Sequence, residues 1–431
     1  MSDQDFKHVV NLLKKLGLSI GDQGLYSATN FLLNILMVRW LSIEEYGFFA
    51  LSFSLFLFFS SIHNSVILEP ITVLATANHK DHLGDYLRTE TRLNLYTVTA
   101  IGIVCIVSSF VAGIFSSRMG TSLMVVGLST PFLLSYWFFR RICYIENLPH
   151  VAVFGSGVYS VLVLTGIFLM RNSNFLGSIA AFALMSLASL ISSLVIWVGF
   201  RRLRTDRPEE KSAAIHEVMK EQWHYGKWVI GVSILYWINS SISIPFLALD
   251  TGFGESGVYR SLQNLILPLQ QIGVAIGNLF LPWFAAIRFS NRKQANRLIL
   301  QVIAGFFVSG IIFILPILIF PEVVLSALYG TGNFESYLLE ARVISIVGLV
   351  LMINAVLTFI LQARKKPNSV LFANLCGSII SIFLVIPIIQ QLGLFGAVIG
   401  LLMTSIAILI PLLILVKNQF QHYENYMVSN E

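Results

Sequence analysis

The segment Gly17–Gly47 combines a length sufficient to cross a lipid bilayer with a stripe of polar side chains. A membrane-spanning helix needs roughly 20 mostly apolar residues. At about 100° per residue, one side of such a helix carries most of the polar groups, namely Asp22, Gln23, Tyr26, Asn30 and Asn34. Polar side chains at this depth are costly against lipid, so this side must face other helices or water. The segment therefore predicts a polar path through a membrane.

The composition predicts that most of the chain lies in a membrane. Of its 431 residues, 56% are hydrophobic and 12% are charged, and the mean hydropathy is +0.78. Soluble domains are about 25% charged. The net charge of +6 does not indicate nucleic-acid binding, because the basic residues form short clusters between apolar segments. The cysteines show neither metal-ligand nor redox spacing, so we expect no metal and no other cofactor.

Twelve apolar segments predict an all-α integral membrane protein. They lie at approximately 17–40, 48–76, 92–115, 121–142, 150–170, 176–200, 226–249, 257–285, 298–320, 338–361, 368–389 and 395–416. The second and eighth are too long for a simple crossing and contain prolines, so we expect tilts or kinks there. The chain then divides into an amphipathic N-terminal segment (1–16), a first lobe (17–200), an inter-lobe connection (201–225), a second lobe (226–416) and a tail (417–431).

The distribution of basic residues predicts that both termini are cytoplasmic. Of the 28 lysines and arginines, 23 fall on the side of the N-terminus and five on the opposite side. Basic residues are enriched in cytoplasmic loops. The N-terminal segment, the inter-lobe connection and the tail are therefore expected in the cytoplasm, which requires an even number of spans.

The two lobes repeat each other in sequence. Glu45–Phe49 matches Glu255–Tyr259 at an offset of 210, and Asn147–Pro149 matches Lys365–Pro367 at an offset of 218. Six spans in each copy imply parallel repeats related by an axis along the membrane normal. This arrangement is typical of transporters, which bind substrate at the interface of the repeats.

Arg260 begins a polar face on the eighth segment. Asn264 and Gln271 share its face, and Gln263 lies to the other side. An arginine followed by amides indicates a hydrated wall that attracts anions. In the alternative interpretation, Arg260 reaches the outer lipid headgroups and the amides join neighbouring helices.

Three further arginines and two carboxylates are candidates for the same path. Arg342, at the outer end of the tenth segment, has the same two interpretations as Arg260. Arg140 and Arg141 end the fourth segment, either as ordinary cytoplasmic basic residues or as an entrance site for phosphate. Asp22 and Glu69 lie towards the cytoplasmic ends of their spans. Each carboxylate could carry a coupling proton or pair with an arginine.

The beginning of the chain resembles that of Wzx-type O-antigen and exopolysaccharide flippases. The resemblance is carried by Asp22, Ala28-Thr-Asn30, Arg39-Trp-Leu and Glu45-Tyr-Gly47, followed by a span rich in Phe, Leu and Ser. These flippases belong to the multidrug/oligosaccharidyl-lipid/polysaccharide exporter superfamily. The resemblance implies a MATE-like fold of two six-helix lobes in the bacterial inner membrane. It also implies alternating access, driven by an H⁺ or Na⁺ gradient.

As substrate, the resemblance implies an oligosaccharide linked to undecaprenyl pyrophosphate, with membrane lipid and polysaccharide assembly proteins as further partners. The arginines would bind the diphosphate, and the amides and Tyr26 the sugar hydroxyls. Two alternatives remain open. A multidrug cation antiporter would need an acidic cavity, and a membrane polymerase or ligase would need a substantial periplasmic loop. Enzyme signatures such as a nucleophile elbow or a phosphate-binding glycine loop are missing from the sequence, so we expect no catalytic residues.

Overall fold

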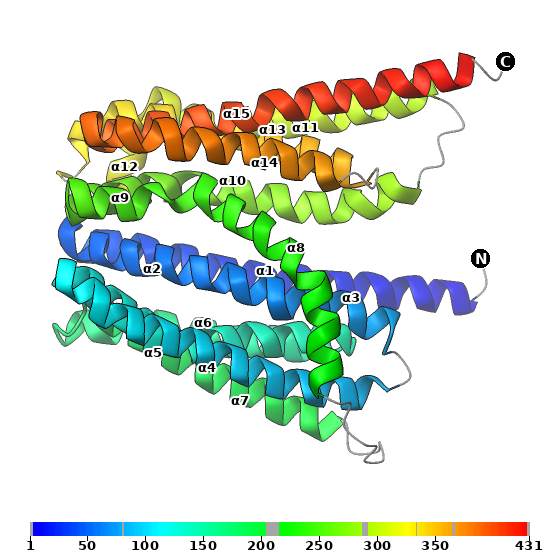
Figure 1. Cartoon of the computed structure of the whole chain (residues 1–431), viewed down its shortest axis with the longest axis horizontal. Helices are drawn as coiled ribbons and strands as arrows, with labels where there is room; N and C mark the ends of the chain where they lie inside the picture. Colours follow the sequence, from blue (N-terminus) through cyan, green and yellow to red (C-terminus); the bar gives the residue numbers. More distant parts are fainter. Residues whose placement is uncertain are drawn as a thin grey trace. The chain divides into compact units, whose positions relative to one another are not determined.

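The computed structural model describes residues 3–79, 82–203, 215–286, 292–332, 334–363 and 367–428, and it contains helices but no β-strand within these ranges (Figure 1). The α-helices are α1 (Asp3–Trp40), α2 (Ile43–His63), α3 (Glu69–Ala77), α4 (Leu83–Phe115), α5 (Ser117–Ile145), α6 (Pro149–Asn172), α7 (Ser178–Leu203), α8 (Ile215–Ser241), α9 (Ser243–Asp250), α10 (Phe253–Ala286), α11 (Arg292–Ile319), α12 (Pro321–Tyr329), α13 (Leu338–Ala363), α14 (Pro367–Ile380) and α15 (Ile386–Val428). Shorter turns are η1 (Asn64–Leu68), η2 (Glu335–Tyr337) and η3 (Ser381–Val385).

Many of these helices are able to cross a membrane. Among the described residues, seven segments are long and apolar enough, and there are nine if two bent helix pairs each count as one span. The pairs are α8 with α9, bent by 48°, and α11 with α12, bent by 90°. The nine include neither α1, whose polar stripe lowers its hydropathy, nor α10, whose side chains after Gly273 lie outside the described ones.

The helix boundaries differ from the predicted ones in several places, because α1 begins at Asp3 rather than at 17, and α15 continues to Val428, beyond the predicted end of the last span at 416. Helix α4 begins at Leu83, before the predicted start of the third span at 92, and α8 begins at Ile215, inside the predicted inter-lobe connection. Helix α8 then continues without a break into the predicted seventh span. The rest of the connection between 204 and 214 lies outside the described residues. Hydropathy marks where a helix is apolar, whereas these helices extend into polar sequence.

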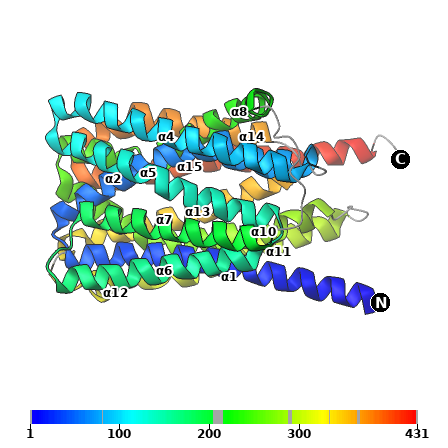
Figure 2. The ribbon, with the colours of Figure 1, turned by 90° about the horizontal axis from the view of Figure 1, so that it is seen from below.

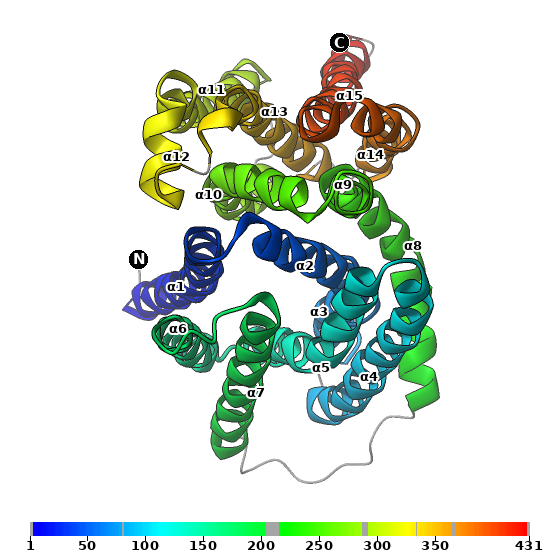
Figure 3. The ribbon, with the colours of Figure 1, turned by 90° about the vertical axis from the view of Figure 1, so that its left-hand side faces the viewer.

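The chain folds into two compact units, and unit 1 consists of Met1–Leu41 and Phe48–Ile234. Within it, α1 packs along α6, and α5 packs along both α4 and α7 (Figures 2 and 3). Glycines bring α4 and α5 together: a Cβ on Gly102 would lie 2.9 Å from the carbonyl oxygen of Gly127, and a Cβ on Gly127 would lie 2.8 Å from that of Gly102. Small residues at such crossings allow membrane helices to approach closely.

The long second span is interrupted in unit 1. The π-helical turn η1 separates α2 from α3, and Pro70 lies in the first turn of α3. Proline has no backbone N–H to continue the helical ladder, so the interruption occurs where the sequence predicts a kink. Beside it, Ile71 of α3, Phe138 of α5 and Val218 of α8 belong to one buried apolar cluster.

Unit 2 consists of Ser42–Gly47 and Leu235–Glu431. Helix α13 packs against α10, α11 and α15, and α14 packs against α15. Near its beginning α15 is broken at Gly393, whose φ of 55° and ψ of −132° are not helical. Oε2 of Glu255 accepts a hydrogen bond from the backbone N–H of Leu394 at 2.7 Å. A carboxylate at this position satisfies a free N–H of the helical segment that follows, so Gly393 forms a turn that interrupts α15.

The sequence repeat reappears inside unit 2 as a symmetric contact. Gly47 and Gly257 occupy equivalent positions at the offset of 210. A Cβ on Gly47 would overlap the carbonyl oxygen of Phe253 at 1.7 Å, and a Cβ on Gly257 would lie 2.6 Å from the carbonyl oxygen of Ile43. Each glycine therefore faces the carbonyl four residues before the other. The first turns of α2 and α10 are thus equivalent in structure as well as in sequence.

Candidate functional site

A buried ion pair joins α1 to α5 in unit 1. Nη2 of Arg140 lies 2.6 Å from Oδ2 of Asp22, and the Asp22 side chain is fully buried. The hydroxyl of Tyr144 also donates to Oδ2, and the hydroxyl of Ser156, on α6, donates to Oδ1. Three helices therefore share one carboxylate. A buried charge without such partners would cost several kcal/mol, so these contacts hold α1, α5 and α6 together.

An aromatic wall surrounds the other side of this arginine. The guanidinium carbon of Arg140 lies 4.5 Å from the ring centroid of Tyr26 and 5.6 Å from that of Tyr136, which are cation–π distances. Nε1 of Trp137 donates to the Tyr26 hydroxyl at 2.7 Å, and the ring of Tyr159 stacks on Tyr136. Nε of Arg140 has no hydrogen-bond partner among the described residues. One N–H of the guanidinium thus remains available.

The amides of α1 extend this polar region along the helix. Nδ2 of Asn30 donates to a carbonyl one turn earlier at 2.9 Å, and its Oδ1 accepts from the Tyr159 hydroxyl at 3.3 Å. Nδ2 of Asn34 donates to the Asn30 carbonyl at 2.8 Å. Gln23, by contrast, is exposed. Two of the three predicted amides therefore belong to the region around the ion pair.

Glu69 and Arg141 form a second acid–base neighbourhood in unit 1, and both are half-buried. Nδ2 of Asn64, in the π-helical turn η1, donates to Oε1 of Glu69 at 3.1 Å. Arg141 interacts electrostatically with Glu69. The two consecutive arginines at the end of α5 therefore each act on one of the two carboxylates predicted as coupling candidates, Asp22 and Glu69.

A second buried arginine, Arg260 of α10, lies in unit 2 with 8% of its surface exposed. Its Nη1 donates to Oε1 of Gln263 at 3.4 Å, and Nε2 of Gln263 donates to the carbonyl of Ser240 at 3.1 Å. Nδ2 of Asn264 donates to a tyrosine hydroxyl at 2.9 Å. Three tyrosines interact with the guanidinium, namely Tyr46, Tyr259 and Tyr329. Arg260 therefore resembles Arg140 in being buried among phenols.

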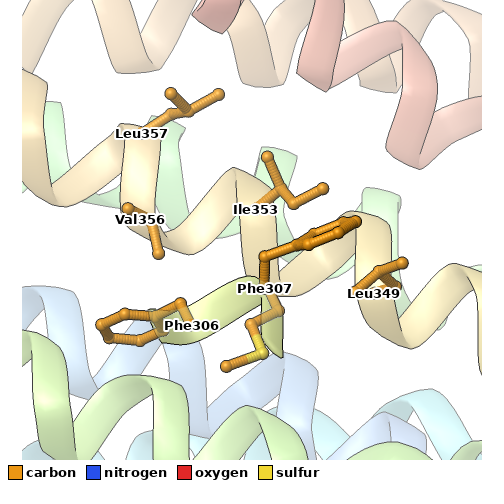
Figure 4. A pocket seen from close by; sticks show the side chains of 7 residues that line it. Phe306, Phe307, Leu349, Ile353, Val356 and Leu357 are labelled. Atoms are coloured by element: carbon orange, nitrogen blue, oxygen red, sulfur yellow. The ribbon is translucent and has the colours of Figure 1, made fainter. Parts of the chain in front are cut away.

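The remaining predicted residues lie elsewhere. Arg342 and Gln271 are exposed and are not buried with either arginine. A pocket in unit 2 is likewise apart from the polar groups, because its lining is apolar: Phe306 and Phe307 from α11 with Leu349, Met352, Ile353, Val356 and Leu357 from α13 (Figure 4). This pocket offers no partner to a phosphate or a sugar hydroxyl.

Sequence reasoning identified Arg140 as a candidate, but it did not identify the other side chains of α5 and α6 that complete the first cluster, namely Tyr136, Tyr144, Ser156 and Tyr159. Tyr136, Arg140 and Tyr144 follow one another at intervals of four residues, so they lie on one face of α5, and this spacing was the available signal. Ser156 and Tyr159 showed no such signal in the sequence, because single serines and tyrosines in apolar helices usually serve packing.

Comparisons with known proteins place the chain in a sequence family and a fold. The profile of a family described as polysaccharide biosynthesis protein matches residues 36–332. No curated protein sequence matches. An inward-facing multidrug resistance MATE family transporter of the MOP superfamily aligns with a TM-score of 0.71 and 15% identity over 94% of this chain and 96% of the other. The lipid II flippase MurJ in an inward closed conformation aligns with a TM-score of 0.72 and 12% identity over 93% and 87%. The predicted all-helical, MATE-like fold is confirmed.

The ion pair predicts a non-additive loss of stability. Asp22→Asn leaves Arg140 buried without a counter-ion, and Arg140→Gln leaves the Asp22 carboxylate buried without one. Each substitution should therefore lower the free energy of unfolding by about 3–5 kcal/mol. The double variant should lose less than the sum of the two. Thermal unfolding of the purified proteins in detergent measures this. Arg39→Gln, at an exposed position, should change stability by less than about 0.5 kcal/mol. Strictly additive losses would contradict the pairing.

Proposed function

Since the chain belongs to the family of polysaccharide biosynthesis proteins, we propose that it is a flippase. It moves a lipid-linked oligosaccharide from the cytoplasmic to the periplasmic leaflet of the bacterial inner membrane by alternating access. The observation that carries this proposal is one buried arginine in each unit, Arg140 and Arg260, each among tyrosines and amides. A guanidinium pairs with phosphate oxygens in bidentate fashion, so the lipid is proposed to be undecaprenyl pyrophosphate.

The groups around the arginines suit the sugar part of such a substrate. The amide of Asn264 and the phenols of Tyr46 and Tyr26 can donate to or accept from sugar hydroxyls. The available Nε–H of Arg140 can bind an anion while its Nη2 stays on Asp22. The lipid tail would remain in the bilayer, and the driving force would be an H⁺ or Na⁺ gradient. Proteins of polysaccharide assembly are the expected partners.

A multidrug transporter shares this fold, but the buried charges favour an anionic substrate. A carrier of organic cations needs acidic groups that attract the positive charge. In this chain the buried Asp22 is already neutralised by Arg140, and Arg260 adds a second buried positive charge. We therefore prefer the flippase to the cation antiporter, and transport to catalysis by a polymerase or ligase.

We infer twelve membrane spans with both termini in the cytoplasm. The nine candidate segments become eleven with α1 and α10. The segment Asn368–Lys417 counts once among the nine, but the break at Gly393 divides it in two. Twelve spans are an even number, in agreement with the 23 basic residues that lie on the side of the N-terminus.

Reporter fusions test this topology. A reporter after Lys417 and one within residues 201–211 should both report the cytoplasm, because their surroundings are basic. A reporter within Thr251–Ser256 should report the periplasm. Alkaline phosphatase and green fluorescent protein, which are active on opposite sides, give the readout. If the first two reporters lie on opposite sides, the even span number is wrong.

Substitutions of Arg260 test the anionic substrate. Arg260→Ala removes the charge and all donors, whereas Arg260→Lys keeps the charge but loses the planar fork. A bidentate contact to a charged group contributes about 1.5–3 kcal/mol, roughly ten- to a hundredfold in affinity. In a flippase-deficient strain, Ala should therefore abolish surface polysaccharide and Lys should restore part of it, at equal protein levels in blots.

The exposed Arg39 provides the matched control, and Arg39→Ala should support normal polysaccharide. Full activity of Arg260→Ala would exclude the proposed role of this arginine. Full activity of Arg260→Lys together with inactive Arg260→Ala would mean that charge alone matters, as for an arginine that only reaches lipid headgroups.

A further inference from the structure

Glu90 of α4 is a fully buried carboxyl that the function described so far does not use. Nε2 of Gln222, on α8, donates to its Oε2 at 2.5 Å. In the part of the chain that the structure describes, Glu90 has no ion-pair partner. Asp22 differs, because Arg140 neutralises it. Burial without a counter-ion strongly disfavours an ionised carboxylate.

The second carboxyl oxygen of Glu90, Oε1, is the atom that can bind a proton. Oε1 of Glu90 and the hydroxyl of Tyr86, one turn earlier on α4, are both buried, and the two side chains interact with each other. A proton on Oε1 would make this oxygen a donor to the phenol oxygen. The phenol can donate to the ionised carboxylate or accept from the neutral acid, so what disfavours the ionised form is its burial without a counter-ion.

The neighbouring residue of α8 makes a second attachment. Oε1 of Glu221 accepts from Nδ2 of Asn78 at 2.5 Å, and its Oε2 lies 2.8 Å from Nε2 of His79. The His79 ring also stacks on Tyr86, with centroids 4.1 Å apart. Two consecutive side chains of α8, at 221 and 222, therefore bind the residues that follow α3 and the buried acid of α4.

The groups that act on Glu90 come from three elements. Tyr86 lies on its own helix, and Glu221 of α8 repels an ionised Glu90. His79, at the end of α3, is linked to Glu90 only through Tyr86 and Glu221. Helix α5 contributes apolar side chains such as Phe138 to the cluster that contains Tyr86. Loss of the proton therefore leaves an uncompensated anion beside another carboxylate.

Helix α8 continues from unit 1 into unit 2. Its part up to Ile234 belongs to unit 1, where Val218 is buried in the apolar cluster and Gly226 packs on the carbonyl of Ser65. From Leu235 onward it belongs to unit 2. A change in the contact between α4 and the first part of α8 therefore acts on the helix through which the chain passes between the units.

We propose that Glu90 is a proton-binding site that controls the attachment of α8 to α4. With the proton bound, Oε2 accepts from Gln222 and Oε1 donates to Tyr86, and the two helices stay together. When Glu90 releases its proton to water, the carboxylate needs hydration, so the α4–α8 contact opens. This inference rests on the proposed function only in assigning the proton to the gradient that drives transport.

Infrared difference spectra of the purified full chain in lipid nanodiscs, recorded as pH is lowered, test proton binding. The wild-type protein should gain a protonated-carboxyl C=O band that Glu90→Gln lacks. Gln222→Leu removes a donor to the ionised form, so the midpoint of this band should move to higher pH, by about one to two units. The matched control Asp85→Asn, on the same helix, should keep the band. An unchanged band in Glu90→Gln overturns the proposal, as does an unchanged midpoint in Gln222→Leu.

Spin labels at the exposed positions Arg88 and Met219, in a background without the native cysteines, report the separation of α4 and α8. This distance should widen as pH is raised in the wild-type protein and stay short in Glu90→Gln. A distance that does not respond to pH in the wild-type protein overturns the attachment role. Neither measurement needs a transport substrate. A negative result in the flippase complementation therefore does not affect the test of Glu90, and a negative result for Glu90 does not contradict the flippase function.

Discussion

The burial of charge is the constraint on which unit 1 depends. The Asp22 carboxylate is fully buried and receives donors from Arg140, Tyr144 and Ser156. In an apolar surrounding no water replaces a missing donor, so the helices that carry these groups must stay in register. Packing alone would not require this, because apolar helix faces can slide against each other at little cost. The ion pair thus fixes the position of α1, and with it the amides that follow Asp22 along the helix.

The two buried arginines have similar aromatic surroundings but different hydrogen-bond partners. Arg140 has a carboxylate partner and an aromatic wall, whereas Arg260 is bound by an amide and lies among phenols. Tyrosines are suitable neighbours for a charge that must bind and release a ligand, because their rings attract a cation without neutralising it. One buried arginine in each unit is therefore a proposed phosphate site.

Periodicity and repetition in the sequence predicted much of the architecture. The polar stripe of α1, the turn at Gly393 and the offset of 210 between Gly47 and Gly257 were all readable, because each is a local pattern or a comparison of the chain with itself. The partners of Asp22 could not be predicted from the sequence, since they depend on which helices become neighbours in the fold. Glu90 was missed for another reason: the apolar stretch begins after it, whereas α4 begins at Leu83. Hydropathy cannot place a buried acid that lies before the apolar part of its helix.

A reconstituted transport assay distinguishes whether this protein moves a lipid because of the lipid's diphosphate. Purified protein in proteoliposomes is given undecaprenyl pyrophosphate carrying a labelled oligosaccharide, and the label accessible from outside is followed over time. A second lipid carries the same sugar without phosphate. The protein should speed transfer of the diphosphate lipid, and this effect should be lost for the neutral lipid and in Arg260→Ala. Equal transfer of both lipids, or transfer of organic cations instead, would contradict this prediction.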